Sequence, residues 1–322
     1  MTAICRDDAA PFVSRIGVVV NRVAGVQNVI EETQQVESLG FGAAWLTNGG
    51  PEDCMPLLAA LALETTNIRL GTSVVQTYPR HPFTLATEAN VIDQLAPGRF
   101  RLGVGPSHAA IMETLGLRRD DPFGNLREYV TVIRTLTSTG SVAFHGDHYH
   151  VTARLNRSFA LPVMIGTLQP KTFELAGAIA DGAITWLCPP AYLRQIAVPL
   201  MERAAASVNR VRPRLIAHVA ACVHDVGDDV RDEVQRSIPN IGFPSYQRML
   251  VAAGYPEASR GKWTDHLVDE IVAWGDEDAV ASRILALFDA GADEVLVRPI
   301  GAGAAPDKVI DRTIRSIAAM HA

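Results

Sequence analysis

Short apolar runs and helix-like segments alternate along this chain from its first regular element onward. Residues 16–20 are the apolar, β-branched kind of run that a strand buried on both faces requires. The apolar positions of 26–39 then fall on one face of a helix, Gly40 follows as a helix end, and 43–46 form the next apolar run. The pattern therefore predicts a strand, a helix and a second strand.

Repeats of this unit fill the chain from end to end. The order of helix, glycine and apolar run returns at 175–186 and at 280–297. The predicted strands lie near 16–20, 43–47, 68–75, 99–104, 161–166, 182–186, 214–222 and 293–298. Eight strands, each followed by a helical stretch, are what an α/β fold of the (β/α)8 TIM-barrel type needs. The rival architecture, an open doubly wound sheet with a second domain, would need a linker or a break in composition, and the sequence contains neither.

The barrel accounts for most, but not all, of the residues. A barrel of this type uses about 250 residues, so roughly 70 remain for a tail and for insertions. We expect a flexible tail at 1–14, a single barrel domain at 15–322, and insertions near 140–160 and 236–266 at the mouth, where the strands end. The first insertion alternates well enough to be a hairpin, whereas the second contains three prolines and is predicted to be irregular.

Composition and charge narrow the class of protein. The 322 residues are 48% hydrophobic, and the formal net charge of −6 leaves no basic surface for nucleic acid. The longest apolar runs, such as 57–63, fall well short of the roughly 18 residues of a membrane-spanning helix. Charged residues at 6–8 interrupt the region where a signal peptide needs its apolar stretch, and the four cysteines show no CxxC spacing. We expect a cytoplasmic protein that acts on a small molecule, with neither nucleic acid nor membrane as partner.

The loops after the third, fourth and fifth strands carry the candidate chemistry, because active sites of such barrels lie at the C-terminal ends of the strands. Gly103 and Gly105 begin like a dinucleotide fingerprint, but His108 stands at the third glycine position, so an NAD site is not supported. These glycines would let the backbone approach a planar ligand, with Ser107 and His108 beside it. An ordinary strand-to-helix turn with an incidental histidine explains the loop equally well.

Two further loops have a chemical and a purely structural interpretation. At 166–171, Pro170 suits the first position of a helix, and the free N–H groups there, with Thr167 and Lys171, suit a phosphate; ordinary capping is the alternative. At 80–82, Arg80 could hold an acidic group of a cofactor or simply form an ion pair beside a helix start.

Several other classes of site are disfavoured. The histidines at 145, 148 and 150 suggest a metal, yet no carboxylate or cysteine spacing completes a site, so we expect none. The chain has no GxSxG elbow and no GxxxxGK[ST] phosphate loop, which argues against a serine hydrolase and a P-loop enzyme.

Several of these segments together resemble one known family. The segments 70–75, 78–82, 93–95 and 97–105 resemble the bacterial luciferase-like monooxygenase superfamily, in particular its coenzyme F420-dependent oxidoreductase branch. The segments 106–108, 126–129 and 267–276 are similar to patterns in actinobacterial members of that branch. The resemblance spans 15–320 and implies a barrel with a flavin or deazaflavin ring across its mouth. It also implies a cis peptide bond between Ser73 and Val74 behind the ring.

The family's binding residues map onto this sequence position by position. The resemblance implies that Ser73, Val74 and Gln76 line the ring, that the loop with Gly105 and His108 forms its other edge, and that 166–169 hold the phosphate. The implied cofactor-binding residues are Asn48, Ser73, Val74, Gln76, Arg80, Gly105, Ser107, Gly166, Thr167, Leu168 and Gln169. Sugar-phosphate dehydrogenases of this branch have an Asp-His pair where this chain has Asn48 and Gly49, which argues against sugar-phosphate oxidation.

The resemblance implies an enzyme that transfers a hydride between coenzyme F420 and a small organic substrate, which then needs a proton. Since histidine titrates near neutrality, we expect His108 as the general acid, with His81 as the second candidate. The alternatives are an FMN-dependent monooxygenase and a non-catalytic flavin-binding barrel; basic residues such as Arg80 and Lys171, which suit an acidic cofactor tail, favour the deazaflavin. Members of the family are often dimers, so a homodimer is consistent with the resemblance.

Overall fold

The computed structural model describes residues 11–20, 25–48, 50 and 52–321 of the chain. Most of the predicted tail, 1–10, lies outside the described residues. Its last part is a 3-10 helix at Phe12–Arg15, and the Phe12 ring packs edge-on against Phe288 with 5.1 Å between ring centroids. These described residues at the end of the predicted tail therefore contact the body of the protein.

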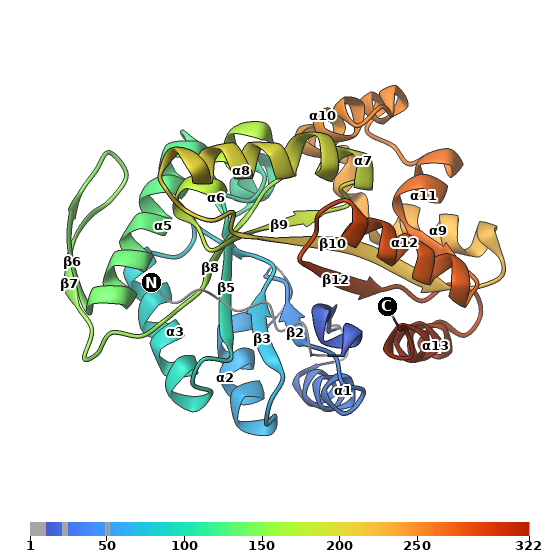
Figure 1. Ribbon diagram of the computed structural model, residues 1–322, viewed down its shortest axis with the longest axis horizontal. Helices are drawn as coiled ribbons and strands as arrows, with labels where there is room; N and C mark the ends of the chain where they lie inside the picture. Colours follow the sequence, from blue (N-terminus) through green and yellow to red (C-terminus); the bar gives the residue numbers. More distant parts are fainter. Residues whose placement is uncertain (1–10, 21–24, 49, 51, 322) are drawn as a thin grey trace.

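Eight parallel strands form a closed barrel (Figure 1). The barrel strands are β1 (Ile16–Val19), β2 (Ala43–Leu46), β3 (Arg69–Thr72), β5 (Phe100–Gly105), β8 (Val163–Gly166), β9 (Gly182–Trp186), β10 (Arg214–Val223) and β12 (Glu294–Pro299). Two short strands, β4 (Val75–Gln76) and β11 (Ala273–Gly275), pair with β5 and β10 near their ends. Closure comes from β12, which pairs with β10 on one side and β1 on the other. The predicted (β/α)8 barrel is confirmed, and the alternative of an open sheet is wrong.

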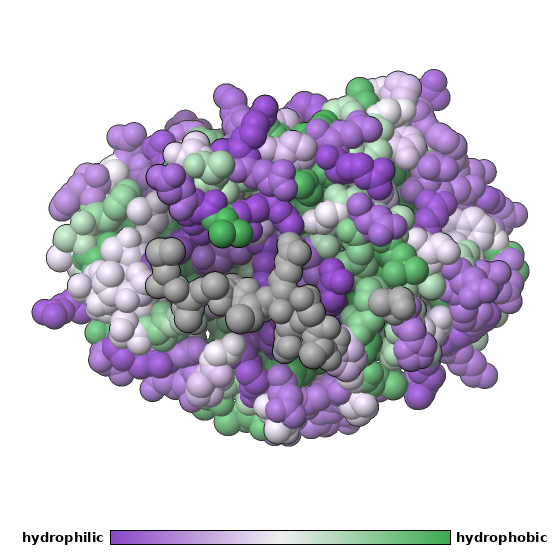
Figure 2. Space-filling model, in the orientation of Figure 1, coloured by the Kyte–Doolittle hydropathy of each residue, from purple (hydrophilic) through white to green (hydrophobic). Residues whose placement is uncertain are grey.

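Helices cover the outside of the barrel. They are α1 (Val26–Ser38), α2 (Cys54–Glu64), α3 (Pro82–Leu95), α4 (Ala109–Thr114), α5 (Pro122–Thr139), α6 (Pro170–Ile179), α7 (Pro190–Tyr192), α8 (Val198–Ser207), α9 (Gly227–Ser237), α11 (Asp265–Ile271), α12 (Glu277–Asp289) and α13 (Pro306–Ala318), with a π-helical turn at Leu193–Ala197. Within the described residues, no helix combines the length and the apolar character needed to cross a membrane. Figure 2 shows hydrophilic side chains over much of one face, with apolar residues in smaller groups between them.

The two insertions differ in structure. The first is the predicted hairpin, formed by β6 (Ser141–His145) and β7 (His150–Arg154), and the Glu128 carboxylate accepts three backbone N–H groups at its tip, at 2.9–3.1 Å. The second was expected to be irregular, and this is wrong. It folds into a 3-10 turn at Pro239–Gly242, α10 (Pro244–Ala252) and a 3-10 turn at Pro256–Arg260. Each proline is the first residue of a helical segment, a position where its missing N–H costs nothing.

Side chains fill the barrel in layers, because alternate residues of each strand point inward. The layer at the N-terminal ends of the strands is ionic: Glu294 lies among Arg69, Arg101 and Arg214. Burial alone would raise the pKa of Glu294, but the three guanidinium groups lower it to about 2. The Arg101 guanidinium also lies 4.7 Å from the centre of the Trp45 ring. Trp45 belongs to an apolar middle layer, which closes the barrel beneath its mouth.

Candidate functional site

The third interior layer forms the floor of the barrel mouth. Trp186, His218 and Arg298 each follow an inward-facing residue of the middle layer by two positions on β9, β10 and β12, so they share its orientation. Ser73 follows β3 on the other side of the floor and lies against His218, with 3.4 Å between Oγ and Nδ1. We call these four residues the floor cluster.

The structure contains the implied cis peptide bond between Ser73 and Val74. The Val74 side chain packs against glycines on two neighbouring strands. A Cβ atom built on Gly105 or Gly166 would lie 3.0 Å from a Val74 methyl group, and one on Gly103 would lie 3.1 Å away. The glycines in these loops thus make room for Val74, which is a different reason from the close approach of a ligand that the sequence suggested.

The floor cluster contains two residues with unusual surroundings. The ring of His218 lies 4.0 Å from that of Trp186, and its Nε2 is buried with no hydrogen-bond partner among the described residues. Burial, with the charge of Arg298 as a second cause, lowers the pKa of His218 well below its ordinary value. His218 is therefore neutral at physiological pH. Arg298 lies over the Trp186 ring at 5.9 Å and, within the described part of the chain, has neither a hydrogen bond nor an ion pair.

Sequence reasoning missed Trp186, His218 and Arg298. A signal for them existed, since a histidine interrupts the otherwise apolar run 215–223 and an arginine ends the run 295–298. The side-chain period of two along each strand would have placed all three inside the barrel.

Other predicted residues gather around this floor. Gln76 pairs in register with Gly105, and the next residue, Thr77, donates its backbone N–H to the Gly105 carbonyl at 3.0 Å. Ser107 has a positive φ of 58°, which turns the chain away from β5 toward α4. Asn48 lies just after β2, and its Oδ1 accepts a hydrogen bond from the Cys54 thiol at 3.7 Å. Its neighbour Gly49 lies outside the described residues.

The second insertion covers part of the mouth and engages His108. The His108 ring stacks on Phe243 with 3.9 Å between centroids and 5° between planes, and Tyr246 lies on α10 at 5.7 Å. Burial, and next the charge of Arg119, lower the pKa of His108 to about 4. About 0.1% of such a group is protonated at pH 7, so this geometry does not favour the general-acid role expected for His108.

The same insertion holds the loop after β8. The Gln169 side-chain amide donates to the Ser245 carbonyl at 2.9 Å, and Tyr192 donates its hydroxyl to the Leu168 carbonyl at the same distance. The Thr167 hydroxyl bonds to that of Thr172. Because these polar groups already have partners inside the protein, the loop fits ordinary helix capping better than a phosphate site.

Arg80 and His81 also have structural partners. The Arg80 guanidinium forms ion pairs with Asp53 and, at 3.1 Å, with Glu88. His81 precedes α3, and its Nδ1 accepts the Phe83 backbone N–H at 3.1 Å as a helix cap. The geometry therefore supports the ion-pair interpretation of this segment over the binding of an acidic cofactor tail.

The hairpin histidines do not converge on one point. His145 and His150 face each other across the hairpin with 5.5 Å between ring centroids, whereas His148 pairs with Asp121 at 3.1 Å. Among the described residues, no group of three His, Cys, Asp or Glu side chains could hold a metal ion.

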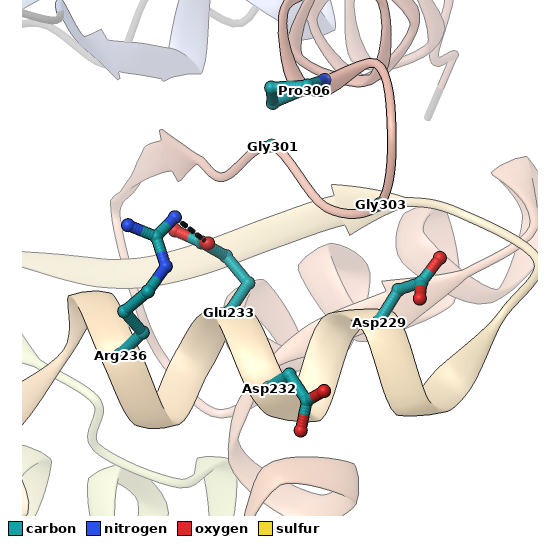
Figure 3. Close-up of a pocket in the computed structure, with 7 residues that line it drawn as sticks. All are labelled: Asp229, Asp232, Glu233, Arg236, Gly301, Gly303 and Pro306. Atoms are coloured by element: carbon teal, nitrogen blue, oxygen red, sulfur yellow. Dashed lines mark hydrogen bonds and ion pairs between the residues drawn. The ribbon is translucent and has the colours of Figure 1, made fainter.

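A hollow of about 300 Å3 lies between α9 and the loop that joins β12 to α13 (Figure 3). Its lining residues are Asp229, Asp232, Glu233, Arg236, Gly301, Gly303 and Pro306, and none of them was predicted as a site residue. Glu233 pairs with Arg236 inside the hollow, and Asp229 pairs with His224 at 2.9 Å. The floor cluster is therefore the better candidate for a functional site.

Comparisons with known proteins identify relatives of the whole barrel. A 5,10-methylenetetrahydromethanopterin reductase of Archaeoglobus fulgidus is 26% identical over 298 residues, which cover 84% of this chain and 88% of the relative. In fold, the coenzyme F420-dependent tetrahydromethanopterin reductase of Methanopyrus kandleri matches with a TM-score of 0.75 at 20% identity, over 94% of this chain and 97% of that one. The oxygenating constituent of a Pseudomonas putida 3,6-diketocamphane monooxygenase, solved with FMN, matches with a TM-score of 0.71 at 16% identity, over the same shares.

The family itself follows from a sequence match. The sequence model described as luciferase-like monooxygenase matches residues 11–294. That stretch contains all eight barrel strands except the end of β12, together with the floor cluster apart from Arg298. Since the match covers far more than half of its length, this chain belongs to the luciferase-like monooxygenase family.

Proposed function

We propose that this chain is a coenzyme F420-dependent oxidoreductase that transfers a hydride between the deazaflavin and a small organic molecule. The observation that carries the proposal is the mouth of a luciferase-like barrel in which Ser73 and Val74, joined by a cis bond, face a floor with two unpaired donors. The similarity along most of the chain to a methylenetetrahydromethanopterin reductase, and in fold to an F420-dependent reductase, supports the choice of cofactor.

The residues at the mouth fit a planar, oxygen-bearing ring. Val74, Gln76 and Gly105 offer a mostly apolar backing, while Trp186 offers an aromatic face beside them. The donors of His218 and Arg298 lack acceptors within the described chain, and the carbonyl oxygens of a deazaflavin ring would supply them. Bound there, the reduced cofactor supplies the hydride, and the protein supplies its orientation.

The covering insertion gives the chain a means to exclude water. α10 is tied to the loop after β8 through Gln169, and Phe243 closes against His108. We keep His108 and His81 as proposed proton donors. For His108 this role requires its ring to leave Phe243, because in the stacked position the ring stays neutral at pH 7.

An FMN-dependent monooxygenase is the second candidate. It is supported by the similarity in fold to a monooxygenase solved with FMN. At 16% identity this likeness extends to the fold alone, so the affinity of the protein for each cofactor has to decide between the two functions.

The proposal predicts turnover with reduced coenzyme F420 in the absence of oxygen. Mixed with the protein and a panel of imines, enones and ketones, the reduced cofactor is expected to regain its oxidised absorbance with at least one acceptor. His108→Ala is expected to lower that rate by about 100-fold and to leave cofactor affinity unchanged. His266→Ala, a change of an exposed histidine on α11, is the control. No turnover with any acceptor would count against the proposal, and unchanged turnover in His108→Ala would remove that residue from the mechanism.

A further inference from the structure

Two donors of the floor cluster point into the barrel from neighbouring strands. In the pairing of β10 with β12, His218 lies opposite Leu296 and Ala220 lies opposite Arg298, so Arg298 stands one inward step closer to the mouth. Trp186 contacts both, at 4.0 Å from the His218 ring and 5.9 Å from the Arg298 guanidinium. The two donors therefore flank one aromatic ring.

Neither donor has an acceptor among the described residues. His218 is 6% exposed, and its buried Nε2 has no hydrogen-bond partner. Buried polar atoms of native proteins are nearly always partnered, so an unpartnered one at a site calls for a ligand or a water molecule. Glu233 is the acidic group whose charge acts on Arg298, but its carboxylate pairs with Arg236 on α9.

The chemistry of the missing acceptor follows from these two groups. When Ser73 donates its hydroxyl hydrogen to Nδ1, the proton of the neutral imidazole sits on Nε2, which then donates. Arg298 is a donor only and carries a positive charge. One electron-rich oxygen, a carbonyl or an enolate, satisfies both groups, and the indole of Trp186 suits a flat conjugated ring that bears it.

We propose that His218 and Arg298 together bind one carbonyl oxygen of the pyrimidinedione ring of the deazaflavin. This inference rests on the proposed function, and it adds the residues that orient the cofactor. Because reduction increases the negative charge on that part of the ring, the pair binds the reduced form more tightly than the oxidised form. A carbonyl oxygen of the substrate is the other source of the same chemistry, and cofactor titrations without substrate distinguish the two.

The test is a set of cofactor titrations with purified variants. Arg298→Met and His218→Phe keep most of the side-chain volume and remove the donors. Each is expected to weaken binding of oxidised F420 about tenfold and of reduced F420 by more, with the same losses for the riboside that lacks the acidic tail. Controls are Arg312→Met on α13 and His266→Phe on α11, two surface positions with exposed side chains. Conservative variants, Arg298→Lys and His218→Gln, are expected to recover part of the affinity and to keep the proposal testable if a harsher change prevents folding.

Each outcome bears on one claim. If the wild-type protein binds no F420, the proposed function fails. If it binds F420 and the folded Arg298 and His218 variants bind both redox forms as tightly as the wild type, the present inference is wrong. Unchanged cofactor affinity together with a raised KM for the acceptor would assign the oxygen to the substrate, which also overturns it.

Discussion

Replacement of Glu294 by glutamine is expected to lower the free energy of unfolding by about 3–5 kcal/mol, because it leaves buried guanidinium groups without their carboxylate. Glu294 is 3% exposed and accepts from Arg101 at 2.7 and 2.8 Å and from Arg214 at 2.8 Å. Glutamine keeps the size of the side chain, so the loss reports on charge rather than on a cavity. Urea unfolding followed by tryptophan fluorescence measures it.

The same variant is expected to change the acid sensitivity of the protein. The folded-state pKa of Glu294 is lowered to about 2 from an ordinary value of 4.5. Its contribution to stability is therefore complete above pH 4.5 and is lost as the pH falls toward 2, and the glutamine variant lacks this part of the acid-induced loss. Glu277→Gln, at an exposed pair with Arg312, is the control and should change little. A Glu294→Gln protein with the stability and pH profile of the wild type would contradict this account of the barrel floor.

Replacement of Gly105 by valine is expected to abolish most cofactor binding, with a loss of affinity on the order of 100-fold, about two factors of ten. Already the Cβ of a new side chain would lie 3.0 Å from a Val74 methyl group, so a branched side chain must displace Val74 into the mouth. The expected cost in stability is smaller, about 1–3 kcal/mol, as for an overpacked core. Fluorescence titration with coenzyme F420 measures the first effect, and thermal unfolding the second.

Gly242→Val is the matched control for this change. Gly242 ends the 3-10 turn before α10, and a Cβ there would meet nothing within 4 Å. The control should bind the cofactor as the wild type does. Wild-type affinity in a folded Gly105→Val protein would show that the ring does not lie over this part of the floor.

The fold could be predicted from the sequence because its signal is local. Runs such as 16–20 and 182–186 are short, apolar and followed by helical segments, and each lies within a residue or two of an observed strand. The second insertion was misjudged, since proline was interpreted as a breaker when Pro239, Pro244 and Pro256 each begin a helical segment.

The candidate site was harder to predict because its contacts are long-range. Nothing near Arg80 in the sequence shows that Asp53 and Glu88 neutralise it, and nothing near His108 shows that Phe243 stacks on it. A histidine that is a sensible proton donor by residue type becomes a neutral ring once an insertion 135 positions later covers it. Inward-facing His218 could have been found from the strand period, because that signal is local.

The central claim is that the mouth of this barrel binds coenzyme F420, and a side-by-side fluorescence titration with F420 and FMN tests it most directly. The account predicts saturable binding of F420 with a clear preference over FMN. Preference for FMN would instead assign the protein to the oxygen-using monooxygenases, and binding of neither cofactor would contradict the assignment of the floor cluster as a cofactor site.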